Sequence, residues 1–536
     1  MECTLTIKEV NLLDNKIALV TPTTDSNRTA EETLALEYLA SVLREKGHGV
    51  VIIDGWLRGI DSETIVEQIF KENVPDIVCM SCYRSNLQQA MELLYKIRQR
   101  HKDIPVICGG YGPTFHDQDF IDAGFDLAVR GEAEHIICQL IDGILSKSSL
   151  STIHGITYKQ NGIVVRTPVS KPITDLDSIP FPDRDEIQTT IKLKNPVHVC
   201  TSRGCRAHCS FCSIAAFNQF LPIKDRWRYR SIENIVDELQ WLHSKFGVTH
   251  IKFVDDSFIE PPRDEFWAIR FADAIINKGI HIRFRTQVRA DRLTRETVAN
   301  LKRAGWFSTS VGIENAAASA LRRIGKIADR NDNIRSLKWL QQAGIYVQMG
   351  MILFDYATTI EELRENYMFL KSQEWVVTKG IFTEMFAAEG TDITTKLRQK
   401  GVAGNKKRQQ NYRYKILDPN ARRAYQIIKL WHRSHAEIYD LAIDPITAPK
   451  VLPEEGYIRL HTVCRRLIVK DVEFFDSVLN HIETEDVIED KEFVVWSIKE
   501  HVGFYSQMKT KAQDIYNDYG LMYNGILNPF INYPDD

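Results

Sequence analysis

The stretch that decides the fold is Thr201 to Cys212, TSRGCRAHCSFC, in which Cys205, Cys209 and Cys212 form the pattern Cys-x3-Cys-x2-Cys. It follows the apolar segment Val197 to Thr201, so the cysteines fall on one short loop at the end of a predicted strand. Three thiolates on such a loop are suited to hold three irons of a 4Fe-4S cluster. The fourth iron then lacks a protein ligand, and an open position distinguishes a catalytic metal centre from a closed one. We therefore predict that these cysteines bind a catalytic iron–sulfur cluster.

A structural zinc site is the alternative for the same cysteines. Cys200 or His208 would supply its fourth ligand, and the chain would then be a zinc-stabilised binding or regulatory module. Zinc sites of this kind usually pair two separated Cys or His clusters, and the sequence holds no second one. Cys464 is isolated near the C-terminus. The spacing therefore favours the iron–sulfur cluster, and metal content would separate the two interpretations.

The cysteines open a series of alternating strands and helices that continues to about residue 391. We predict its strands at 197–201, 250–255, 283–287, 309–313, 346–353 and 380–385. Helical segments such as 232–246 and 297–304 lie between them. Six βα repeats favour a parallel barrel or partial barrel, with its chemistry at the carboxyl ends of the strands. Asp255 and Asp256, which end the second strand, are therefore expected near the site.

The first 145 residues show a second such series. The predicted strands are 16–21, 50–53, 76–81, 105–108 and 127–129, with helices at 29–46 and 88–100. Continuous apolar strands separated by amphipathic helices predict a parallel sheet covered on both faces, which binds ligands beyond the carboxyl ends of its strands. The loop Gly109-Gly110-Tyr111-Gly112-Pro113 lies at such an end, where its glycines allow either close ligand approach or simply a tight turn. No GxGxxG pattern follows the first strand, which argues against a nicotinamide site.

The remaining segments have other characters. Residues 146–195 form a predicted connector with a hairpin around Asn161-Gly162. Helical patterns such as 422–441 and 474–481 dominate from about residue 396, after a basic stretch that we interpret as a solvated connection. We therefore predict four parts: residues 1–145, 146–195, 196–395 and 396–536.

Composition excludes several protein classes. The 536 residues carry 68 Lys and Arg against 71 Asp and Glu, a net charge of −3, which gives no reason to expect nucleic acid or an anionic membrane as partner. No apolar run approaches the roughly 18 residues of a membrane helix, and Glu2 and Lys8 interrupt any signal-peptide core. We therefore expect a cytoplasmic protein without a membrane span, whose thiols stay reduced.

The cysteine triad, with Phe211 at the aromatic position before its last cysteine, resembles the radical S-adenosylmethionine (radical SAM) superfamily. The resemblance implies that the three cysteines bind a 4Fe-4S cluster whose fourth iron chelates the amino and carboxylate groups of S-adenosylmethionine. Reductive cleavage then yields a 5′-deoxyadenosyl radical that abstracts hydrogen. Later segments extend the resemblance: IKFVDDS at 251–257, RTQVRAD at 285–291, VGIEN at 311–315, and Gly390-Thr391. The S-adenosylmethionine contacts that it implies are Phe211, Asp255, Gln287, Arg289, Gly312 and Glu314. The chain departs from the family after the fifth strand, where MILFDYATTIEEL (351–363) replaces a Gly-x-Pro-Gly stretch.

A doubly wound domain ahead of this barrel resembles the cobalamin-binding class of the superfamily. The segments that carry the resemblance are DIVCMSCYRSN (76–86), CGGYGPT (108–114), VRGEAE (129–134) and DLDSIPFPDRD (175–185). It implies cobalamin contacts at Thr23, Ser81, Tyr83, Arg84, Gly109, Gly110, Gly131 and Glu132. The chain lacks the Asp-x-His-x-x-Gly motif that supplies a cobalt-ligating histidine in methionine-synthase-like domains. We therefore expect a lower cobalt face free of histidine, with Tyr83 or Arg84 covering it.

Together these features predict an α/β protein: a doubly wound cobalamin-binding domain, a connector, a radical SAM partial (β/α)6 barrel and a helical C-terminal domain that selects the substrate. Methylation of an unactivated carbon, in a small-molecule or peptide precursor of a natural product, is the favoured reaction. The alternative on the same cofactors is a radical cyclisation, rearrangement or oxidation without methylation. Either reaction needs an external electron donor such as flavodoxin or ferredoxin. No catalytic residue beyond the cofactor ligands is identified from the sequence.

Overall fold

The computed structural model describes residues 13–23, 31–72, 74–83, 86–219, 222–406, 412–447, 450–484 and 488–521. The chain divides into two compact units, Met1–Thr189 and Thr190–Asp536. In the described residues, no helix is both long enough and apolar enough to span a membrane.

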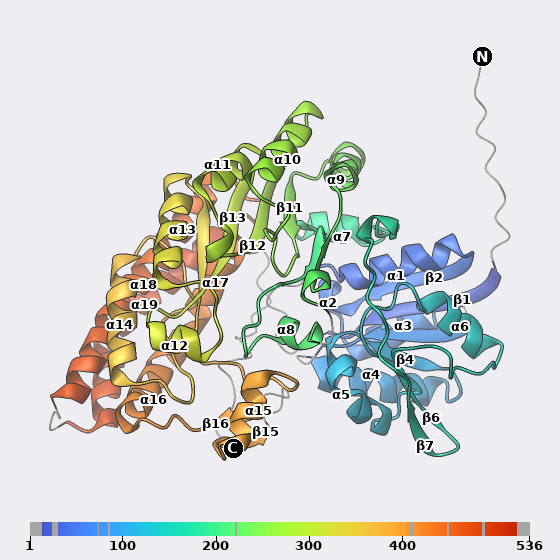
Figure 1. The fold of residues 1–536 in the computed structure, drawn as a ribbon, viewed down its shortest axis with the longest axis horizontal. Helices are drawn as coiled ribbons and strands as arrows, with labels where there is room; N and C mark the ends of the chain where they lie inside the picture. The colour runs from blue at the N-terminus through green and yellow to red at the C-terminus, as the bar shows by residue number, and fades with distance from the viewer. Residues whose placement is uncertain are drawn as a thin grey trace. The chain divides into compact units, whose positions relative to one another are not determined.

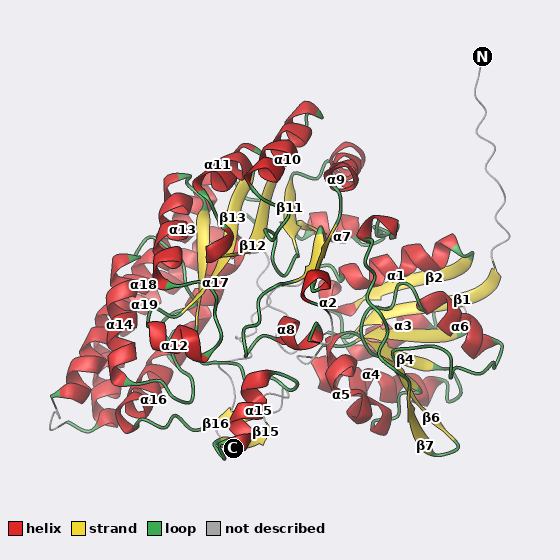
Figure 2. Ribbon diagram, viewed as in Figure 1, coloured by secondary structure: helices red, strands yellow, loops and turns green. Residues whose placement is uncertain are grey.

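The first unit is built on a seven-stranded sheet with the strand order β2-β1-β3-β4-β5-β6-β7 (Figures 1 and 2). Its first five strands are parallel, and the order 2-1-3-4-5 is that of a doubly wound fold with a switch point between β1 and β3. The strands are β1 Leu13–Thr21, β2 His48–Asp54, β3 Ile77–Ser81, β4 Val106–Gly109, β5 Leu127–Val129, β6 Ile156–Gln160 and β7 Ile163–Arg166.

Helices cover both faces of this sheet. Apolar side chains of α3 (Ser62–Ile69), α4 (Leu87–Arg100) and α5 (Tyr111–Asp122) form one core cluster with the strands. Those of α1 (Leu34–Glu45) and α6 (Ile137–Leu145) form another. The short helix α2 is Gly55–Arg58, and α7 (Ile187–Lys192) spans the division between the units. The strand runs are apolar throughout because both faces are buried in this way.

The hairpin that we predicted within the connector forms as expected but joins the main sheet. Asn161 and Gly162 have φ angles of 51° and 78°, as a tight hairpin turn requires. β6 pairs antiparallel with β5 and with β7. The segment that follows is also tied to this unit, because Arg184 makes ion pairs with Glu32 and Glu37 at 3.2 and 3.1 Å.

The second unit contains a five-stranded parallel sheet in the order β14-β13-β12-β11-β8. Its strands are β8 Val197–Val199, β11 His250–Phe253, β12 Arg283–Arg289, β13 Trp306–Glu314 and β14 Tyr346–Met351. Its helices are α8 Ser213–Phe217, α9 Ile232–Phe246, α10 Glu265–Asn277, α11 Arg295–Arg303, α12 Ala318–Arg323, α13 Arg330–Gln342 and α14 Ile360–Ser372. β9 (Ser202–Gly204) and β10 (Trp227–Tyr229) form a small antiparallel pair beside the cysteine loop.

The sixth strand predicted at 380–385 does not form. The chain there makes two isolated parallel bridges, Gln348 with Val377 and Phe354 with Glu384, instead of a continuous ladder. Gly380 has a φ of +87°, which interrupts extended backbone between the two bridges. The barrel therefore has five regular strands and a sixth, irregular segment.

The C-terminal part is helical, as predicted. Its main helices are α16 Pro419–Arg433, α17 Ala436–Thr447, α18 Glu454–Glu483 and α19 Asp490–Asp518. α15 Asp392–Gln399 and the antiparallel pair β15 Ala403–Lys406 and β16 Tyr412–Tyr414 precede them. The helix predicted at 422–441 is two helices, because α16 ends before Ser434 and α17 begins at Ala436.

Candidate active site and cofactor-binding loops

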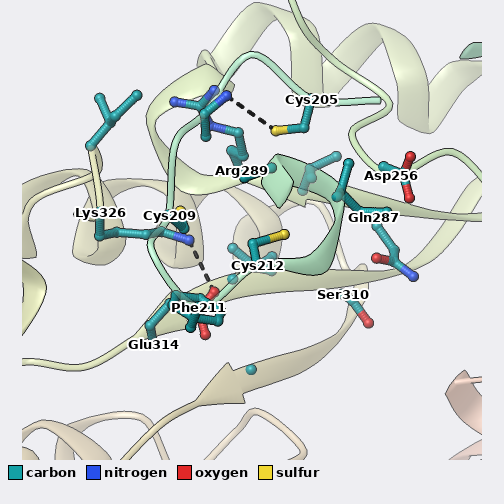
Figure 3. Close-up of a pocket in the computed structure, with 18 of the residues that line it drawn as sticks. Cys205, Cys209, Phe211, Cys212, Asp256, Gln287, Arg289, Ser310, Glu314 and Lys326 are labelled. Carbon is teal, nitrogen blue, oxygen red and sulfur yellow. Dashed lines mark hydrogen bonds and ion pairs between the residues drawn. The ribbon is translucent and has the colours of Figure 1, made fainter. Parts of the chain in front are cut away.

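The three cysteines of the triad line one cavity of about 310 Å³ in the second unit. Figure 3 shows Cys205, Cys209 and Cys212 around it, with side chains from β12 and β13 beside them. The other predicted residues that line it are Phe211, Gln287, Arg289, Gly312 and Glu314. The cavity therefore brings together residues that are more than 100 positions apart in the sequence, at the carboxyl ends of the strands.

The cysteine loop is held by backbone contacts on both sides. The Cys212 amide donates to the Cys209 carbonyl at 3.0 Å, which closes a turn between the last two cysteines. The amide of Ser210 donates to the Ile324 carbonyl at 2.9 Å, and the Ser210 carbonyl accepts from the Ile393 amide at 2.9 Å. These bonds fix the loop without engaging any of its thiols.

The three cysteines are uncrosslinked and lie near cationic groups; Cys209 is buried, and Cys205 and Cys212 are half-buried. Burial raises the pKa of Cys205 to about 12 and that of Cys209 to about 11, so both are protonated at neutral pH in the protein alone. The positive charges of Arg289 and Lys326 act in the opposite direction on these two pKa values. A metal that takes these ligands must therefore displace protons.

Arg289 is oriented toward the cysteine loop by two carboxylates. Its guanidinium donates to Glu260 at 2.8 Å and to Asp291 at 2.7 and 3.1 Å. The Cys205 thiol in turn donates to Glu260 at 3.5 Å. Arg289 points toward Cys205 in Figure 3, so Glu260 fixes a cation beside the first cysteine.

Of the two aspartates after β11, Asp256 lines the cavity as expected and Asp255 does not. Asp255 is 1% exposed, does not line the cavity, and accepts hydrogen bonds from the Thr201 amide and the Ser202 hydroxyl, both at 2.7 Å. Asp256 lines the cavity instead and accepts from the Gly204 amide at 2.9 Å. Desolvation by the surrounding protein, together with the negative charge of Asp255, raises the pKa of the Asp256 carboxyl to about 6. Neighbouring residues point in opposite directions, and a sequence pattern alone does not say which of a pair faces the site.

Glu314 and Lys326 form an ion pair at the carboxyl end of β13. Lys326 Nζ lies 3.0 Å from Glu314 Oε1, and both side chains are largely buried (Figure 3). A Cβ at Gly312 would lie 2.6 Å from Glu314 Oε1 and 2.9 Å from Lys326 Nζ. A side chain larger than that of Gly312 would therefore push the charged ends of this pair out of their present positions. Glu314 itself has a φ of +67° where the β13–β14 register shifts, a strained conformation that turns its side chain into the cavity.

Sequence reasoning missed three polar residues of the cavity, Ser310, Lys326 and Gln348. Ser310 and Gln348 both line the cavity, and the Ser310 hydroxyl donates to Gln348 Oε1 at 3.0 Å. Lys326 lies after α12, outside every quoted motif. Gln348 was visible only as a polar interruption in the apolar run of the fifth strand, and a lysine in a loop gives no sequence signal of this kind.

In the first unit, the predicted cofactor residues lie in loops at the carboxyl ends of the parallel strands. Thr23 follows β1, Ser81 ends β3, and Tyr83 follows it, whereas Arg84 is outside the described residues. Tyr83 packs edge-on against Trp56 with the ring centroids 5.4 Å apart. Burial and the charge of Asp54 raise the pKa of Tyr83 to about 12, so it remains a neutral phenol.

The loops after β3, β4 and β5 are connected by hydrogen bonds. The Gly112 amide donates to the Cys82 carbonyl at 3.0 Å, and the Cys82 amide to the Gly109 carbonyl at 2.8 Å. Thr114 Oγ1 donates to the Gly110 carbonyl at 2.7 Å and accepts from the Gly131 amide at 3.0 Å. The three loops therefore form one connected edge, and Thr114 is a residue that sequence reasoning did not single out.

Gly131 and Glu132 differ in what they face. Gly131 has a φ of +94°, and a Cβ added there would meet no atom within 4 Å, so it borders open space. The Glu132 carboxylate accepts from the Ile173 amide at 2.9 Å. In this structure Glu132 therefore anchors the segment after β7, while Gly131 leaves the edge open for a ligand.

Two family models match this chain. The B12 binding domain matches residues 24–141, and the Radical SAM superfamily matches residues 199–370. The chain is a radical SAM enzyme that carries a B12-binding domain. Its two domains imply three cofactors: cobalamin, a 4Fe-4S cluster and S-adenosylmethionine.

Relatives of this radical SAM enzyme differ in their reactions. An uncharacterized methyltransferase from Pyrococcus horikoshii is 29% identical over 468 residues, 84% of this chain and 97% of its own. The anaerobic magnesium-protoporphyrin IX monomethyl ester cyclase from Synechocystis is 26% identical over 344 residues, 62% of this chain and 66% of its own. The solved structure of the cobalamin-dependent S-adenosylmethionine radical enzyme OxsB, with aqua-cobalamin bound, has a TM-score of 0.74 at 19% identity. The alignment covers 96% of this chain and 82% of the OxsB chain, and this match confirms the predicted fold.

The residues present fit both resident cofactors of a cobalamin-binding radical SAM enzyme. Three thiols around one cavity, with cations beside two of them, are a donor set for a 4Fe-4S cluster. In the first unit, no atom lies within 4 Å of the position that a Cβ would take at Gly131, so the backbone there is open to a bulky ligand.

We expect Gly110→Ala to destabilise the B12-binding domain of this radical SAM enzyme, because the new Cβ would lie 2.8 Å from the Cys82 carbonyl oxygen at a φ of +100°. The expected loss is about 1–3 kcal/mol of unfolding free energy. Gly109→Ala is the matched control, since its Cβ would meet only Val129 at 3.7 Å. Urea unfolding of the full chain measures both, and equal stability of the two variants would contradict the packing described.

Proposed function

We propose that the enzyme methylates an unactivated carbon of a small molecule or peptide. Three cysteines that converge on one cavity, in a chain that also has a B12-binding domain, are the observation that carries the proposal. A relative described as a methyltransferase that aligns over 97% of its own length supports it. When bound, the cluster with S-adenosylmethionine supplies a carbon-centred radical, and cobalamin supplies the methyl group.

The cavity residues have distinct proposed roles. Cys205, Cys209 and Cys212 hold the cluster. Arg289, fixed by Glu260 and Asp291, keeps a positive charge beside Cys205 and so favours its thiolate form. Glu314 and Lys326 offer one carboxylate and one ammonium to S-adenosylmethionine, whose methionine end carries the complementary charges.

The nucleoside of S-adenosylmethionine is placed on the strand side of the cavity in this proposal. Gln287, Ser310 and Gln348 present amide and hydroxyl groups there, and Phe211 presents an aromatic face. Asp256 takes the place first expected for Asp255. The buried apolar side chains of Val288 and Val311 exclude water from the strand side of the cavity.

The parts of the chain have corresponding proposed roles. The B12-binding domain covers about residues 1–145, the connector 146–195, the radical SAM barrel 196–395 and the helical domain 396–536. The helical domain reaches the barrel end, because Tyr425 of α16 donates to Glu384 of the irregular sixth segment at 2.8 Å. We assign substrate selection to this domain, and reduction of the cluster to an external flavodoxin or ferredoxin.

A reaction without methylation is the second candidate, because one relative is described as a cyclase. The two candidates differ in the fate of S-adenosylmethionine. Each methyl group taken from it leaves S-adenosylhomocysteine, whereas radical formation leaves 5′-deoxyadenosine. Mass spectrometry of both products during turnover therefore separates them. Methylation predicts comparable amounts of the two, and 5′-deoxyadenosine without S-adenosylhomocysteine would favour the cyclisation, rearrangement or oxidation.

We expect Tyr83 to cover the lower cobalt face without binding it, since its phenol stays neutral and no Asp-x-His-x-x-Gly motif is present. Electron paramagnetic resonance of the Co(II) form should then show no nitrogen superhyperfine splitting. Tyr83→Ala should admit water and change the signal, while Tyr83→Phe, which keeps the ring, should not. Clear nitrogen splitting in the unmodified enzyme would show that a histidine binds cobalt and that this assignment is wrong.

A further inference from the structure

A buried polar cluster in the helical domain takes no part in the chemistry above. It consists of His432 at the end of α16, His435 between α16 and α17, and Asp471 in the middle of α18. They are 2%, 2% and 0% exposed, respectively. One possible ligand atom from each residue lies within 4.8 Å of those of the other two. Two imidazoles and a carboxylate are a common donor set for divalent transition metals.

The Asp471 carboxylate is held in one orientation by neutral donors. Oδ1 accepts from Trp431 Nε1 at 2.9 Å and from the Tyr505 hydroxyl at 3.1 Å. Oδ2 accepts from the Tyr439 hydroxyl at 2.7 Å. Hydrogen bonds of this kind orient carboxylates that bind metals, and Oδ2 keeps a free lone pair.

His435 has polar contacts at both ring nitrogens. Nδ1 lies 3.2 Å from the Ser434 oxygen, whose hydroxyl donates to the Trp431 carbonyl at 2.7 Å. Nε2 lies 3.1 Å from Asp471 Oδ1. A proton on Nε2 makes this contact an ordinary hydrogen bond, whereas a proton on Nδ1 leaves Nε2 free to bind a metal ion.

The 3.1 Å separation of Nε2 and Oδ1 is close to what a metal ion requires. Two ligands about 2.0–2.2 Å from one tetrahedral zinc ion are about 3.3–3.6 Å apart, so this pair would open by a few tenths of an ångström on binding. The same separation also suits a hydrogen bond from His435 to Asp471. The neighbouring His432 distinguishes these two interpretations.

His432 offers a second nitrogen to the same space. Its Nδ1 is buried and has no hydrogen-bond partner in the part of the chain that the structure describes. Gly380 borders this atom, and a Cβ added there would lie 2.6 Å from His432 Nδ1 and 3.1 Å from Asp471 Oδ2. The absent Cβ therefore leaves a small space onto which a bare ring nitrogen and a carboxylate oxygen both open. A proton shared between His435 and Asp471 would leave His432 unexplained, whereas an ion would engage all three residues.

We propose that His432, His435 and Asp471 bind a zinc ion that ties the α16–α17 junction to α18. The hydrogen bonds from Trp431, Tyr439 and Tyr505 would then hold the Asp471 carboxylate in the orientation that binds the ion. This site is separate from the cysteine cavity, shares no residue with it, and does not depend on the reaction proposed above.

X-ray absorption at the zinc edge tests the site in the full-length enzyme with its iron–sulfur cluster assembled. We expect about one zinc per chain after incubation with Zn²⁺ alone and removal of excess metal. Its ligands should be nitrogen and oxygen at about 2.0–2.2 Å, without the sulfur shell at about 2.3 Å that zinc bound to the cysteine triad would give. A sulfur shell alone, or no retained zinc, would overturn the proposal.

Variants assign the zinc to this cluster. His432→Gln should weaken zinc binding at least about 100-fold, because it removes a direct ligand. His461→Gln is the matched control: His461 is an imidazole of the same helical domain, in α18, but its Nε2 faces the Trp375 carbonyl at 3.0 Å. Equal content of the iron–sulfur cluster and equal melting temperature would show that both variants are folded. Zinc retained at full affinity in His432→Gln would overturn the site and leave His435 as a hydrogen-bond partner of Asp471.

Discussion

Replacing Cys205, Cys209 or Cys212 by alanine should abolish formation of 5′-deoxyadenosine under reducing, anaerobic conditions. The three thiols line one cavity, and no other cysteine among the described residues lines it. Loss of one thiolate should therefore prevent stable cluster binding instead of merely slowing turnover. Iron content, the visible spectrum and 5′-deoxyadenosine yield are the measurements, and each should fall to background.

Two cysteines outside the cavity provide matched controls for this prediction. Cys200 precedes the loop, where its thiol donates to the Ser202 carbonyl at 3.4 Å, and Cys464 is buried in α18. Cys200→Ala and Cys464→Ala should keep the cluster and the activity. Full activity in any variant of the triad would show that the cluster assignment is wrong.

Gly312→Ala should weaken binding of S-adenosylmethionine about 10- to 100-fold while leaving the cluster in place. The added methyl group would lie 2.6 Å from Glu314 Oε1 and 2.9 Å from Lys326 Nζ, so the ion pair must move or break. This effect corresponds to about 1.4–2.8 kcal/mol of binding free energy. Equilibrium dialysis of S-adenosylmethionine against the cluster-loaded protein measures it.

Gly350 offers the control because it pairs with Gly312 across β13 and β14. A Cβ at Gly350 would meet no atom closer than 3.5 Å, so Gly350→Ala should change the affinity little. If both variants bind as tightly as the unmodified enzyme, the ion pair does not contribute to the site. If Gly312→Ala also loses iron, the substitution has disturbed the cysteine loop and the assignment of Gly312 to S-adenosylmethionine fails.

Much of the fold could be predicted because it depends on local patterns. Continuous apolar runs mark strands covered on both faces, and the strand predicted at 127–129 forms with the same bounds as β5. Asn161-Gly162 identifies a hairpin turn from two residues. The pairing of that hairpin with β5 could not be predicted, since it depends on which sheet edge is free after the chain has folded.

The site, like the fold, could be predicted where it depends on local sequence and could not where it depends on residues from distant elements. The cysteine spacing predicts a cluster because the three candidate ligands lie on one loop, and the VGIEN segment places Gly312 and Glu314 at the same cavity. The partner of Glu314 is Lys326, which comes from the end of a different helix and follows no motif. Asp255 and Asp256 show a further limit, because adjacent residues of one type differ only in the direction of their side chains. The sixth barrel segment fails as a strand because Gly380 adopts a positive φ that its apolar neighbours do not reveal.

Transfer of an isotopically labelled methyl group tests the central claim most directly. The cluster-loaded enzyme is incubated with a reductant, S-adenosylmethionine labelled in its methyl group, and a metabolite extract, with and without cobalamin. The account predicts a product that carries the labelled methyl on carbon, formed only when cobalamin is present, together with 5′-deoxyadenosine. Formation of 5′-deoxyadenosine with no labelled product, or labelling at the same rate without cobalamin, would contradict it.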